Sequence, residues 1–282
     1  MNPRPDHPST PRLPAGPAIQ PPPLDPFNNF GPDHNVKVLP RHLAGPGERD
    51  LASIWPFPFE NGWHLHPADE GMAFSSSPCA RLWTRLVLEP DTPGQGTWTI
   101  GANRIPFGPK AWEITFDVTT PAELVRDVNA ELLDVYLEDR YSDRDRLFDD
   151  DTAPHTAYAP LFARGWSHEV EMAGTQTFHS PDGLGAVRHQ FPPGSSGESA
   201  HAAWTAWAGA STHPRWKARF TQGAPATLVA AFTASLISTE PLHRAVKDVP
   251  LDFRHSLYMA AATAHQPTAV PPPAGPAPGR TR

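Results

Sequence analysis

Hydrophobic and polar residues alternate along three segments of the first half of the chain, 81–88, 97–102 and 111–118. In each segment the apolar residues fall mainly on every second position, the pattern of a strand with one buried face. Glycine and proline residues between the segments mark turns. The spacing therefore predicts an antiparallel meander, with a further strand before Ser77.

The pattern changes to a helical period after Thr120. The sequence Thr120-Pro121-Ala122-Glu123 has the form of a capping box, in which Thr120 is the N-cap and Glu123 reaches back to it. The apolar residues that follow fall on one stripe of a helix, namely Leu124, Val125, Val128, Leu132, Leu133, Tyr136 and Leu137. We expect this helix to cover one face of the sheet, which gives a β-β-β-β-α unit.

The whole pattern occurs twice. A long stretch beginning at Trp63 recurs from Trp166, at a spacing of about 103 positions. The matched pairs include Ser77 with Ser180, Arg85 with Arg188, Trp98 with Trp204, Trp112 with Trp216, Phe116 with Phe220 and Leu124 with Leu228. A period this long indicates whole small domains. The predicted fold class is α+β: two tandem β-β-β-β-α units, each an antiparallel sheet covered by one helix, with disordered Pro-rich termini.

Composition sets the boundaries of these units. Many of the 37 prolines lie near the two ends, where the chain has too few apolar residues to offset its conformational entropy. The acidic stretch around residues 141–154 is predicted to be a solvated linker, and a short helix is expected before each Gly-Trp pair. The predicted segments are a disordered tail (1–34), the first domain (35–140), the linker (141–154), the second domain (155–247), a candidate short helix (248–265) and a second disordered tail (266–282).

Charge and cysteine content narrow the class of protein. The formal net charge is −7 and Cys79 is the single cysteine, so an internal disulfide is excluded. The chain has no apolar run of 18 residues and no apolar run near its start. We therefore expect a soluble, cytoplasmic protein that does not interact with membranes.

Several sequence features resemble those of the actinobacterial SPDY-domain proteins, a family usually found as tandem copies. They are the segment 36–47, the two Gly-Trp pairs and the run Ser180-Pro181-Asp182-Gly183. The similarity spans residues 36–242. Gly183 stands where tyrosine is typical, and in the first copy Cys79-Ala80 replaces Asp-Tyr. The resemblance implies two SPDY-like domains, and it implies no known activity or catalytic residue.

Candidate catalytic and metal-binding residues are few. His64 and His66 lie on one face of a predicted strand, but no third ligand accompanies them. No G-x-S-x-G motif is present to provide a nucleophile for His179 or His189, and no base is evident beside Cys79. We expect no catalytic residue, no cofactor and no metal site, and therefore a protein that is not an enzyme.

Basic and aromatic residues gather on the strand faces that point away from the predicted helices. On residues 215–220, alternation places three cations on the outer face and the aromatic residues in the core. The complete candidate binding face is Arg81, Trp83, Arg85, Arg188, Trp207, Arg215, Lys217 and Arg219.

Two functions are compatible with this face. The first is an interaction or regulatory module, in which Trp83 and Trp207 belong to an apolar patch that contacts an unknown protein partner or a second copy of the chain. The alternative is single-stranded nucleic-acid binding, in which cations contact phosphates and rings stack on bases. Because the net charge is negative, and Glu113 and Asp117 lie on or near the corresponding strand of the first copy, the interaction module is favoured.

Overall fold

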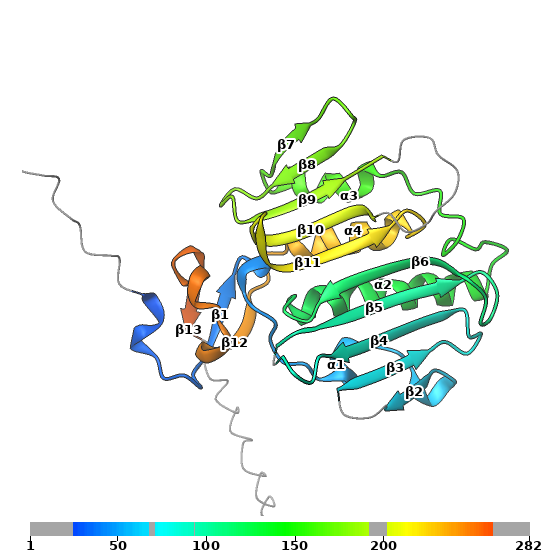
Figure 1. Ribbon diagram of the computed structural model, residues 1–282, viewed down its shortest axis with the longest axis horizontal. Helices are drawn as coiled ribbons and strands as arrows, with labels where there is room; N and C mark the ends of the chain where they lie inside the picture. The colour runs from blue at the N-terminus through cyan, green and yellow to red at the C-terminus, as the bar shows by residue number, and fades with distance from the viewer. Residues whose placement is uncertain (1–24, 68–70, 93, 192–201, 262–282) are drawn as a thin grey trace, which may run out of the picture.

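The computed structural model describes residues 25–67, 71–92, 94–191 and 202–261. The tails 1–24 and 262–282, predicted to be disordered, lie outside the described residues. Two antiparallel sheets organise the described part of the chain (Figure 1), one of ten strands and one of three. Among the described residues, no helix is both long enough and apolar enough to cross a membrane.

The ten-stranded sheet contains both copies of the repeat, in the order β2-β3-β4-β5-β6-β11-β10-β9-β8-β7. The first copy contributes β2 (His64–Pro67), β3 (Met72–Ser76), β4 (Leu82–Leu88), β5 (Gly96–Asn103) and β6 (Lys110–Asp117), followed by α2 (Ala122–Arg140). The second contributes β7 (Ser167–Val170), β8 (Gln176–His179), β9 (Gly185–His189), β10 (Ala202–Ala210) and β11 (His213–Thr221), followed by α4 (Ala226–Leu236). The expected short helices precede the copies as α1 (Leu51–Ile54) and α3 (His155–Ala163).

Each copy has five strands before its helix, whereas the sequence predicted four. Two strands rather than one precede Ser77 (β2 and β3) and Ser180 (β7 and β8), and β2 and β7 form the two edges of the sheet. All the residues of β7 are exposed, so this strand has no buried face and no alternation by which the sequence could reveal it. The two copies also share one sheet, whereas the prediction gave each copy its own.

The seam between the copies has an approximate two-fold symmetry. Strands β6 and β11 are antiparallel neighbours, and Thr115 lies directly opposite Arg219. These two residues are equivalent positions of the repeat, since the spacing between the copies is 104 here (219 − 115). An axis between them therefore exchanges the first copy with the second.

Hydrogen bonds at the seam follow the same symmetry. The Asp117 carboxylate accepts from the backbone N–H of Lys217 at 2.8 Å, and the Thr221 hydroxyl accepts from the backbone N–H of Glu113 at 2.8 Å. Asp117 is equivalent to Thr221, and Glu113 to Lys217. Both side chains replace a backbone acceptor where the strand pairing ends, so the seam is bonded beyond its paired residues.

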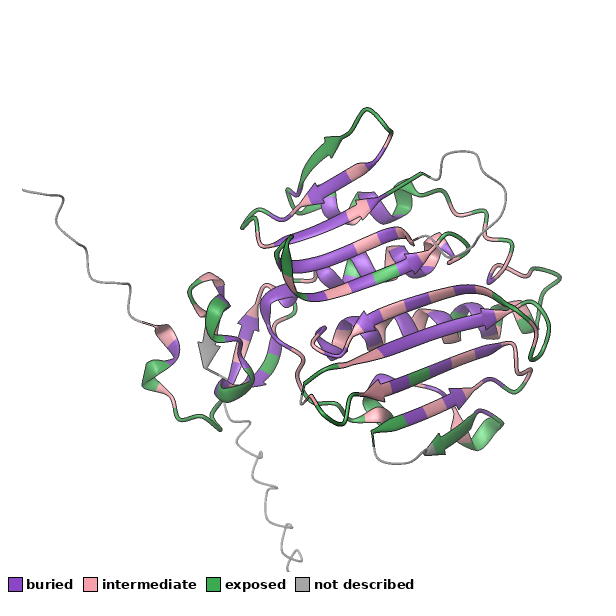
Figure 2. Cartoon of the chain, viewed as in Figure 1, coloured by how far each residue is buried: buried purple, intermediate pink, exposed green. Residues whose placement is uncertain are grey.

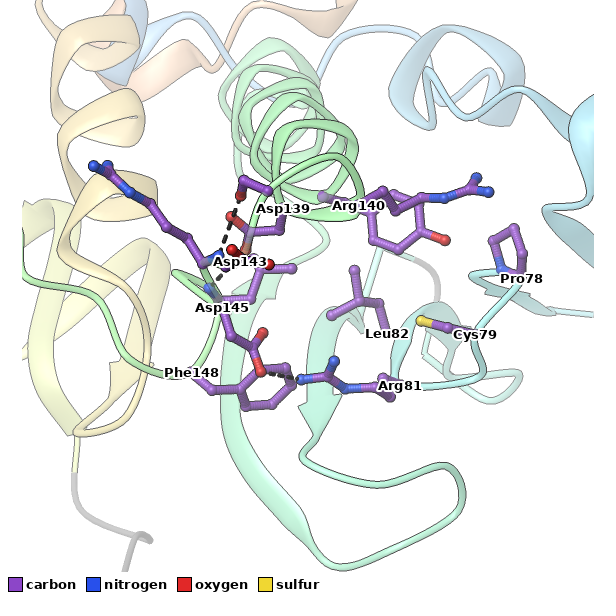
Figure 3. A pocket seen from close by; sticks show the side chains of 13 residues that line it. Pro78, Cys79, Arg81, Leu82, Asp139, Arg140, Asp143, Asp145 and Phe148 are labelled. Atoms are coloured by element: carbon purple, nitrogen blue, oxygen red, sulfur yellow. Dashed lines mark hydrogen bonds and ion pairs between the residues drawn. The ribbon is translucent and has the colours of Figure 1, made fainter.

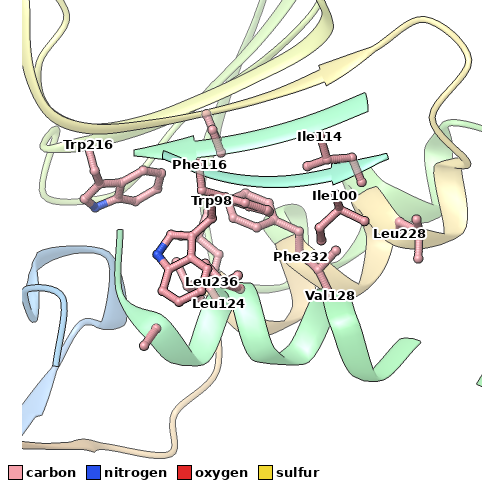
Figure 4. Close-up of a cluster of buried hydrophobic side chains, with 14 of the residues drawn as sticks. Trp98, Ile100, Ile114, Phe116, Leu124, Val128, Trp216, Leu228, Phe232 and Leu236 are labelled. Atoms are coloured by element: carbon pink, nitrogen blue, oxygen red, sulfur yellow. The ribbon is translucent and has the colours of Figure 1, made fainter. Parts of the chain in front are cut away.

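Helices α2 and α4 pack against each other and cover one face of the sheet (Figure 1). Ring contacts cross the seam, since the Phe116 ring on β6 lies 6.0 Å from the Phe232 ring on α4. The residues labelled in Figure 4 are at most 2% exposed, and they are Trp98, Ile100, Ile114, Phe116, Leu124, Val128, Trp216, Leu228, Phe232 and Leu236. The two copies thus share one core, built from the predicted apolar positions.

The predicted capping box at the start of α2 is wrong. The Thr120 hydroxyl is buried without a hydrogen-bond partner among the described residues. Glu123 instead forms two hydrogen bonds with Arg244, at 2.7 and 2.6 Å. Arg244 is 3% exposed and requires a buried counter-charge, so this long-range ion pair removes Glu123 from the helix cap. The backbone N–H of Ala122 bonds to the Pro46 carbonyl oxygen at 2.9 Å.

The smaller sheet joins segments from the two ends of the described chain. Strand β1 (Asn35–Leu39) lies between β12 (Leu242–Ala245) and β13 (Tyr258–Ala261). The candidate short helix at 248–265 is instead a 3₁₀ helix, η5 (Leu251–Ser256), followed by β13, with residues 262–265 outside the description. The other 3₁₀ helices are η1 (Pro26–Asn29), η2 (Arg41–Leu43), η3 (Phe59–Asn61) and η4 (Val246–Asp248).

Residues 25–34 are structured, although the sequence predicted a tail as far as residue 34. Phe27 is 1% exposed, and the Arg254 guanidinium lies 5.2 Å from the centre of its ring. Asp25 forms an ion pair with Arg254 at 3.0 Å. Phe27 and Asp25 thus hold the start of this segment against Arg254 of η5. The high proline content of the region does not reveal this contact.

The linker 141–154 is packed against the domains, contrary to the expectation of a solvated segment. Leu147 is 3% exposed, and its carbonyl oxygen accepts a hydrogen bond from the Trp112 indole at 2.6 Å. At the other end of the linker, Asp150 accepts from the backbone N–H of Thr227 at the start of α4. Its acidic residues therefore serve as caps and ion-pair partners.

Candidate functional site

The side of the ten-stranded sheet opposite α2 and α4 is not covered by a helix, and we call it the open face (Figure 1). Alternation along the strands decides which side chains reach it. Along β6 and β11, buried residues alternate with partly or fully exposed ones (Figure 2). Because successive side chains of a strand point to opposite faces, the buried residues point toward the helices and the others to the open face.

One row of directly opposed residues crosses the open face from edge to edge. The register places three arginines and four threonines in this row, with an aromatic pair at one end. In sheet order it contains His66, Phe74, Arg85, Thr99, Thr115, Arg219, Thr205, Arg188, Thr177 and Glu169. We call this set the transverse row. It combines guanidinium groups with the partly exposed hydroxyls of Thr115 and Thr205, which are hydrogen-bond donors suited to anionic oxygen atoms, whereas Thr99 and Thr177 are buried.

In the first copy, Trp83 lies beside this row. Its ring stacks with Phe74 at 6.4 Å between centres, and the Arg85 guanidinium lies 5.6 Å from its centre. The ring covers Gly101, where an added Cβ would lie 2.2 Å from an atom of the indole. Gly101 therefore provides the space in which Trp83 lies flat on the sheet.

The second copy also has a tryptophan opposite a small residue, but its tryptophan lies on the other strand of the pair. Trp83 on β4 faces Gly101 on β5, whereas Trp207 on β10 faces Ala186 on β9. Because β4 corresponds to β9 and β5 to β10, the tryptophan and the small residue have exchanged strands. The Arg188 guanidinium, equivalent to that of Arg85, lies 5.5 Å from the Trp207 ring. Each copy thus keeps one Trp–Arg pair at the same point of the open face.

The exposure of the two tryptophans differs. Trp83 is partly exposed, but Trp207 is only 8% exposed. The prediction that Trp207 faces away from the helices agrees with the register, yet the ring is buried beneath its neighbours. Trp207 therefore serves mainly as a platform for Arg188.

The described cations of the open face form no direct ion pairs. None of Arg85, Arg188, Arg215, Lys217 and Arg219 forms an ion pair within 4.0 Å in the described part of the chain. Asp117 lies near the seam cations, and burial raises its pKa even though Lys217 and Arg219 act to lower it. The candidate residues of β4, β9 and β11 thus lie on one face, where Asp117 interacts electrostatically with Lys217 and Arg219 without a direct ion pair.

Arg81 does not belong to this surface, although the sequence placed it there. It forms an ion pair with Asp145 at 2.7 Å and lies 4.3 Å from the centre of the Phe148 ring. Figure 3 shows these contacts in a pocket of about 500 Å³ at the end of α2. The packed linker supplies both partners. Alternation alone would place Arg81 on the open face, but these contacts hold its side chain in the pocket instead. The Cys79 thiol lines the same pocket, and its described lining residues include no histidine that would act as a base.

The Ser180-Pro181-Asp182-Gly183 run forms a tightly bonded turn between β8 and β9. The Ser180 hydroxyl donates to Asp182 and accepts from the backbone N–H of Gly185 at 2.8 Å. The Asp182 carboxylate also accepts from the backbone N–H of Leu184 and contacts His42 Nε2 at 3.0 Å. Although burial opposes it, the hydrogen bonds with His42, Ser180 and Leu184 lower the pKa of Asp182 to about 2.

This arrangement is structural and lacks the geometry of a catalytic triad. Ser180 and His42 both bond to the same carboxylate, so no base is positioned to remove the serine proton. The first copy repeats the turn, since the Ser77 hydroxyl accepts from the backbone N–H of Leu82 at 3.1 Å. Cys79 replaces the aspartate there and lies 3.3 Å from the Ser77 hydroxyl. The role of His42 was not detected from the sequence, because nothing in the pattern links residues so far apart.

His189 is a core residue. It is 5% exposed, stacks on Trp204 at 3.9 Å between ring centres, and bonds through Nδ1 to the Tyr158 hydroxyl at 2.5 Å. Burial lowers the pKa of His189 to about 4 and raises the pKa of Tyr158 to about 12. Both groups are therefore neutral near pH 7 and stabilise the fold around α3.

Possible metal ligands do not gather in the described residues. His64 and His66 lie on β2 with their ring centres 6.1 Å apart. No group of three or more His, Cys, Asp or Glu side chains suited to a metal ion occurs in the described ranges. His179 faces Glu169 at 4.0 Å across β7 and β8.

The fold and the open face define a tandem α+β protein whose two domains share one sheet. Comparison with known families gives the identity of those domains. Residues 76–137 and 179–242 each match the SPDY domain, a domain of unknown function (DUF317). The chain therefore carries two SPDY domains, one in each copy of the repeat. No curated protein and no solved structure matches the chain.

Proposed function

We propose that this protein is a non-enzymatic interaction module, and that its open face binds an acidic surface of another protein. The observation that carries the proposal is a set of cations on that face that form no ion pair within 4.0 Å among the described residues, in a chain whose net charge is −7. Complementary charge steers partners and selects among them. The Trp–Arg pair retained in both copies supports a shared binding role for Arg85 and Arg188.

An acidic protein surface fits better than a nucleic acid. Stacking of bases requires exposed rings, and Trp207 is 8% exposed. At the centre of the transverse row Thr115 lies opposite Arg219, and Glu113 and Asp117 lie at the same seam. A continuous strand of phosphates would be repelled there, whereas a folded partner can place its carboxylates over the arginines alone.

Single-stranded nucleic acid remains the second candidate, because the first copy presents a short aromatic row. The His66, Phe74 and Trp83 rings follow one another at 5.9 and 6.4 Å between centres, and Arg85 lies against the last of them. This is a combination that bases and phosphates both contact. Because this aromatic row is restricted to the first copy, we favour a protein partner over a nucleic acid.

Site-specific photo-crosslinking in a lysate of the source cells tests the proposal. A benzophenone side chain replaces Thr205, which lies between Arg188 and Arg219 in the row. We expect one protein to be crosslinked from this position and not from Asp134, an exposed residue on α2. Arg188→Glu with Arg219→Glu should abolish the adduct, while Arg140→Glu with Arg144→Glu, the same charge change elsewhere, should leave it.

A second measurement separates the two candidates. Anisotropy of a labelled thirty-nucleotide oligo-dT should change little on adding the protein at 150 mM salt, and nuclease treatment should not affect the protein adduct. Tight, strongly salt-dependent binding of the oligonucleotide that is lost in Arg85→Glu would favour the nucleic-acid function. Equal crosslinking from Thr205 and Asp134 would contradict binding at the open face altogether.

A further inference from the structure

We propose that a pocket beside the second SPDY turn binds a small ligand with an apolar body and an anionic group. The pocket has a volume of about 580 Å³, within the usual range for small-molecule sites. It lies on another part of the molecule from the transverse row, and none of the residues of that row lines it. The inference is therefore independent of the function proposed for the open face.

Five segments that are distant in the sequence form the pocket. They are 39–42 after β1, 164–166 before β7, 181–182 in the turn between β8 and β9, 236–239 at the end of α4, and 255–258 at the end of η5. The apolar lining side chains include Leu39, Trp166, Leu236, Ile237 and Leu257. These segments come from the smaller sheet and its flanks and from the second SPDY domain, so the pocket lies where the two meet.

Hydrogen bonds to His42 hold this junction in place. The Trp216 indole donates to the His42 carbonyl oxygen at 2.9 Å, while the His42 ring contacts Asp182. The Trp166 ring packs edge-on against the His42 ring at 6.0 Å. Because these groups are fixed before a ligand arrives, binding would cost little reorganisation.

The charges of the pocket favour an anion. Among the described residues, the one carboxylate that lines the pocket, Asp182, already forms hydrogen bonds with His42, Ser180 and the backbone of Leu184. Arg164 lines the pocket and is exposed, and its guanidinium has no hydrogen-bond or ion-pair partner in the residues that the structure describes. His255 supplies a further ring nitrogen to the lining. A ligand carboxylate, sulfonate or phosphate would satisfy Arg164 while its apolar part contacts Trp166.

The equivalent pocket of the first copy provides an internal comparison. It lies beside the Ser77-Pro78 turn, has a volume of about 500 Å³ and is shown in Figure 3. Its arginines are accompanied by acids, since Asp139, Asp143 and Asp145 all line it. An anion would be repelled by these carboxylates, so the proposed ligand distinguishes the second copy from the first.

Binding of 1-anilinonaphthalene-8-sulfonate, an aromatic sulfonate, tests the proposal on the full chain. We expect a saturable rise in its fluorescence with one site per chain. Arg164→Glu should weaken the affinity at least about tenfold, because a charge-assisted hydrogen bond is replaced by repulsion. Thr239→Trp should abolish binding by filling the mouth, since Thr239 is exposed and lines the pocket.

The matched control is Arg144→Glu, the same charge change at an exposed arginine of the first pocket. It should leave the affinity unchanged. Circular dichroism and the melting temperature establish that each variant is folded, and a variant that unfolds is replaced by Arg164→Gln or Ser256→Trp. Absence of saturable binding, or equal affinity in the wild type, Arg164→Glu and Thr239→Trp, would overturn the proposal.

Discussion

At the residue scale, side chains that look chemically suggestive in the sequence prove to be structural. Ser180 and Asp182 stabilise a turn through hydrogen bonds, and His189 packs in the core between Trp204 and Tyr158. The sequence provides no catalytic motif for these residues. Their partners were not predictable, because the partners come from segments that only the folded chain brings near.

The buried imidazole predicts a pH dependence of stability. The pKa of His189 is about 4 in the folded protein against an ordinary value of 6.5. The unfolded chain therefore binds a proton between these values that the folded protein does not, and the free energy of unfolding falls as the pH drops from 6.5 to 4, by roughly 3 kcal/mol. Urea unfolding from pH 7 to pH 4 measures this loss.

The double variant His189→Phe with Tyr158→Phe removes the titrating group and its hydroxyl partner together. Its loss of stability over the same pH range should be smaller than that of the wild type by about the same amount. Asp182 does not contribute in this window, because its lowered pKa moves its effect below pH 3.8. Parallel pH profiles of the two proteins would contradict the burial of a neutral imidazole.

Gly101 gives a second prediction at this scale. A methyl group there would meet the Trp83 ring at 2.2 Å, so Gly101→Ala should destabilise the protein by about 1–3 kcal/mol through overpacking. In the Trp83→Ala background the same change should cost nothing or stabilise slightly, since alanine fits a strand better than glycine. Thermal unfolding of the wild type, the two single variants and the double variant gives a double-mutant cycle. If the two changes in unfolding free energy were additive, the Trp83 ring would not lie over Gly101.

At the element scale, periodicity was a reliable guide where one face is buried and uninformative where none is. The stripes that predicted α2 and α4 lie in the core, and the meander strands β4, β5 and β6 occur where alternation placed them. The exposed edge strand β7 gave no signal, and the cap of α2 was wrong because Arg244 engages Glu123. Local patterns report burial, and they do not report which distant charge requires a partner.

Helix α4 offers the corresponding test. Leu228 is fully buried, and Leu228→Ala should lower the free energy of unfolding by about 2–5 kcal/mol through the cavity that it leaves. Leu137→Ala, at a partly exposed position of the α2 stripe, should cost clearly less. Chemical denaturation of both variants makes the comparison, and equal losses would be inconsistent with the observed packing of α4.

At the scale of the whole molecule, the duplication was visible in the sequence but its consequence was not. Two separate sheets were predicted, and the structure joins β6 to β11 so that one open face spans both domains. An unpaired strand edge favours such pairing, yet nothing in the alternation says which edges meet. The sequence therefore predicted which residues of each strand belong to the candidate face. Their order in the transverse row follows only from the strand register across the seam.

A cross-link between β6 and β11 tests this central feature most directly. In a Cys79→Ser background, Thr115→Cys and Arg219→Cys place two thiols at directly opposed positions, where Cβ atoms of neighbouring strands lie about 5 Å apart. Mild oxidation followed by peptide mapping should reveal an intramolecular disulfide in the monomer, and Thr115→Cys with Arg188→Cys should give none. Failure of the first pair to cross-link, or cross-linking only between molecules, would contradict a single sheet shared by the two SPDY domains.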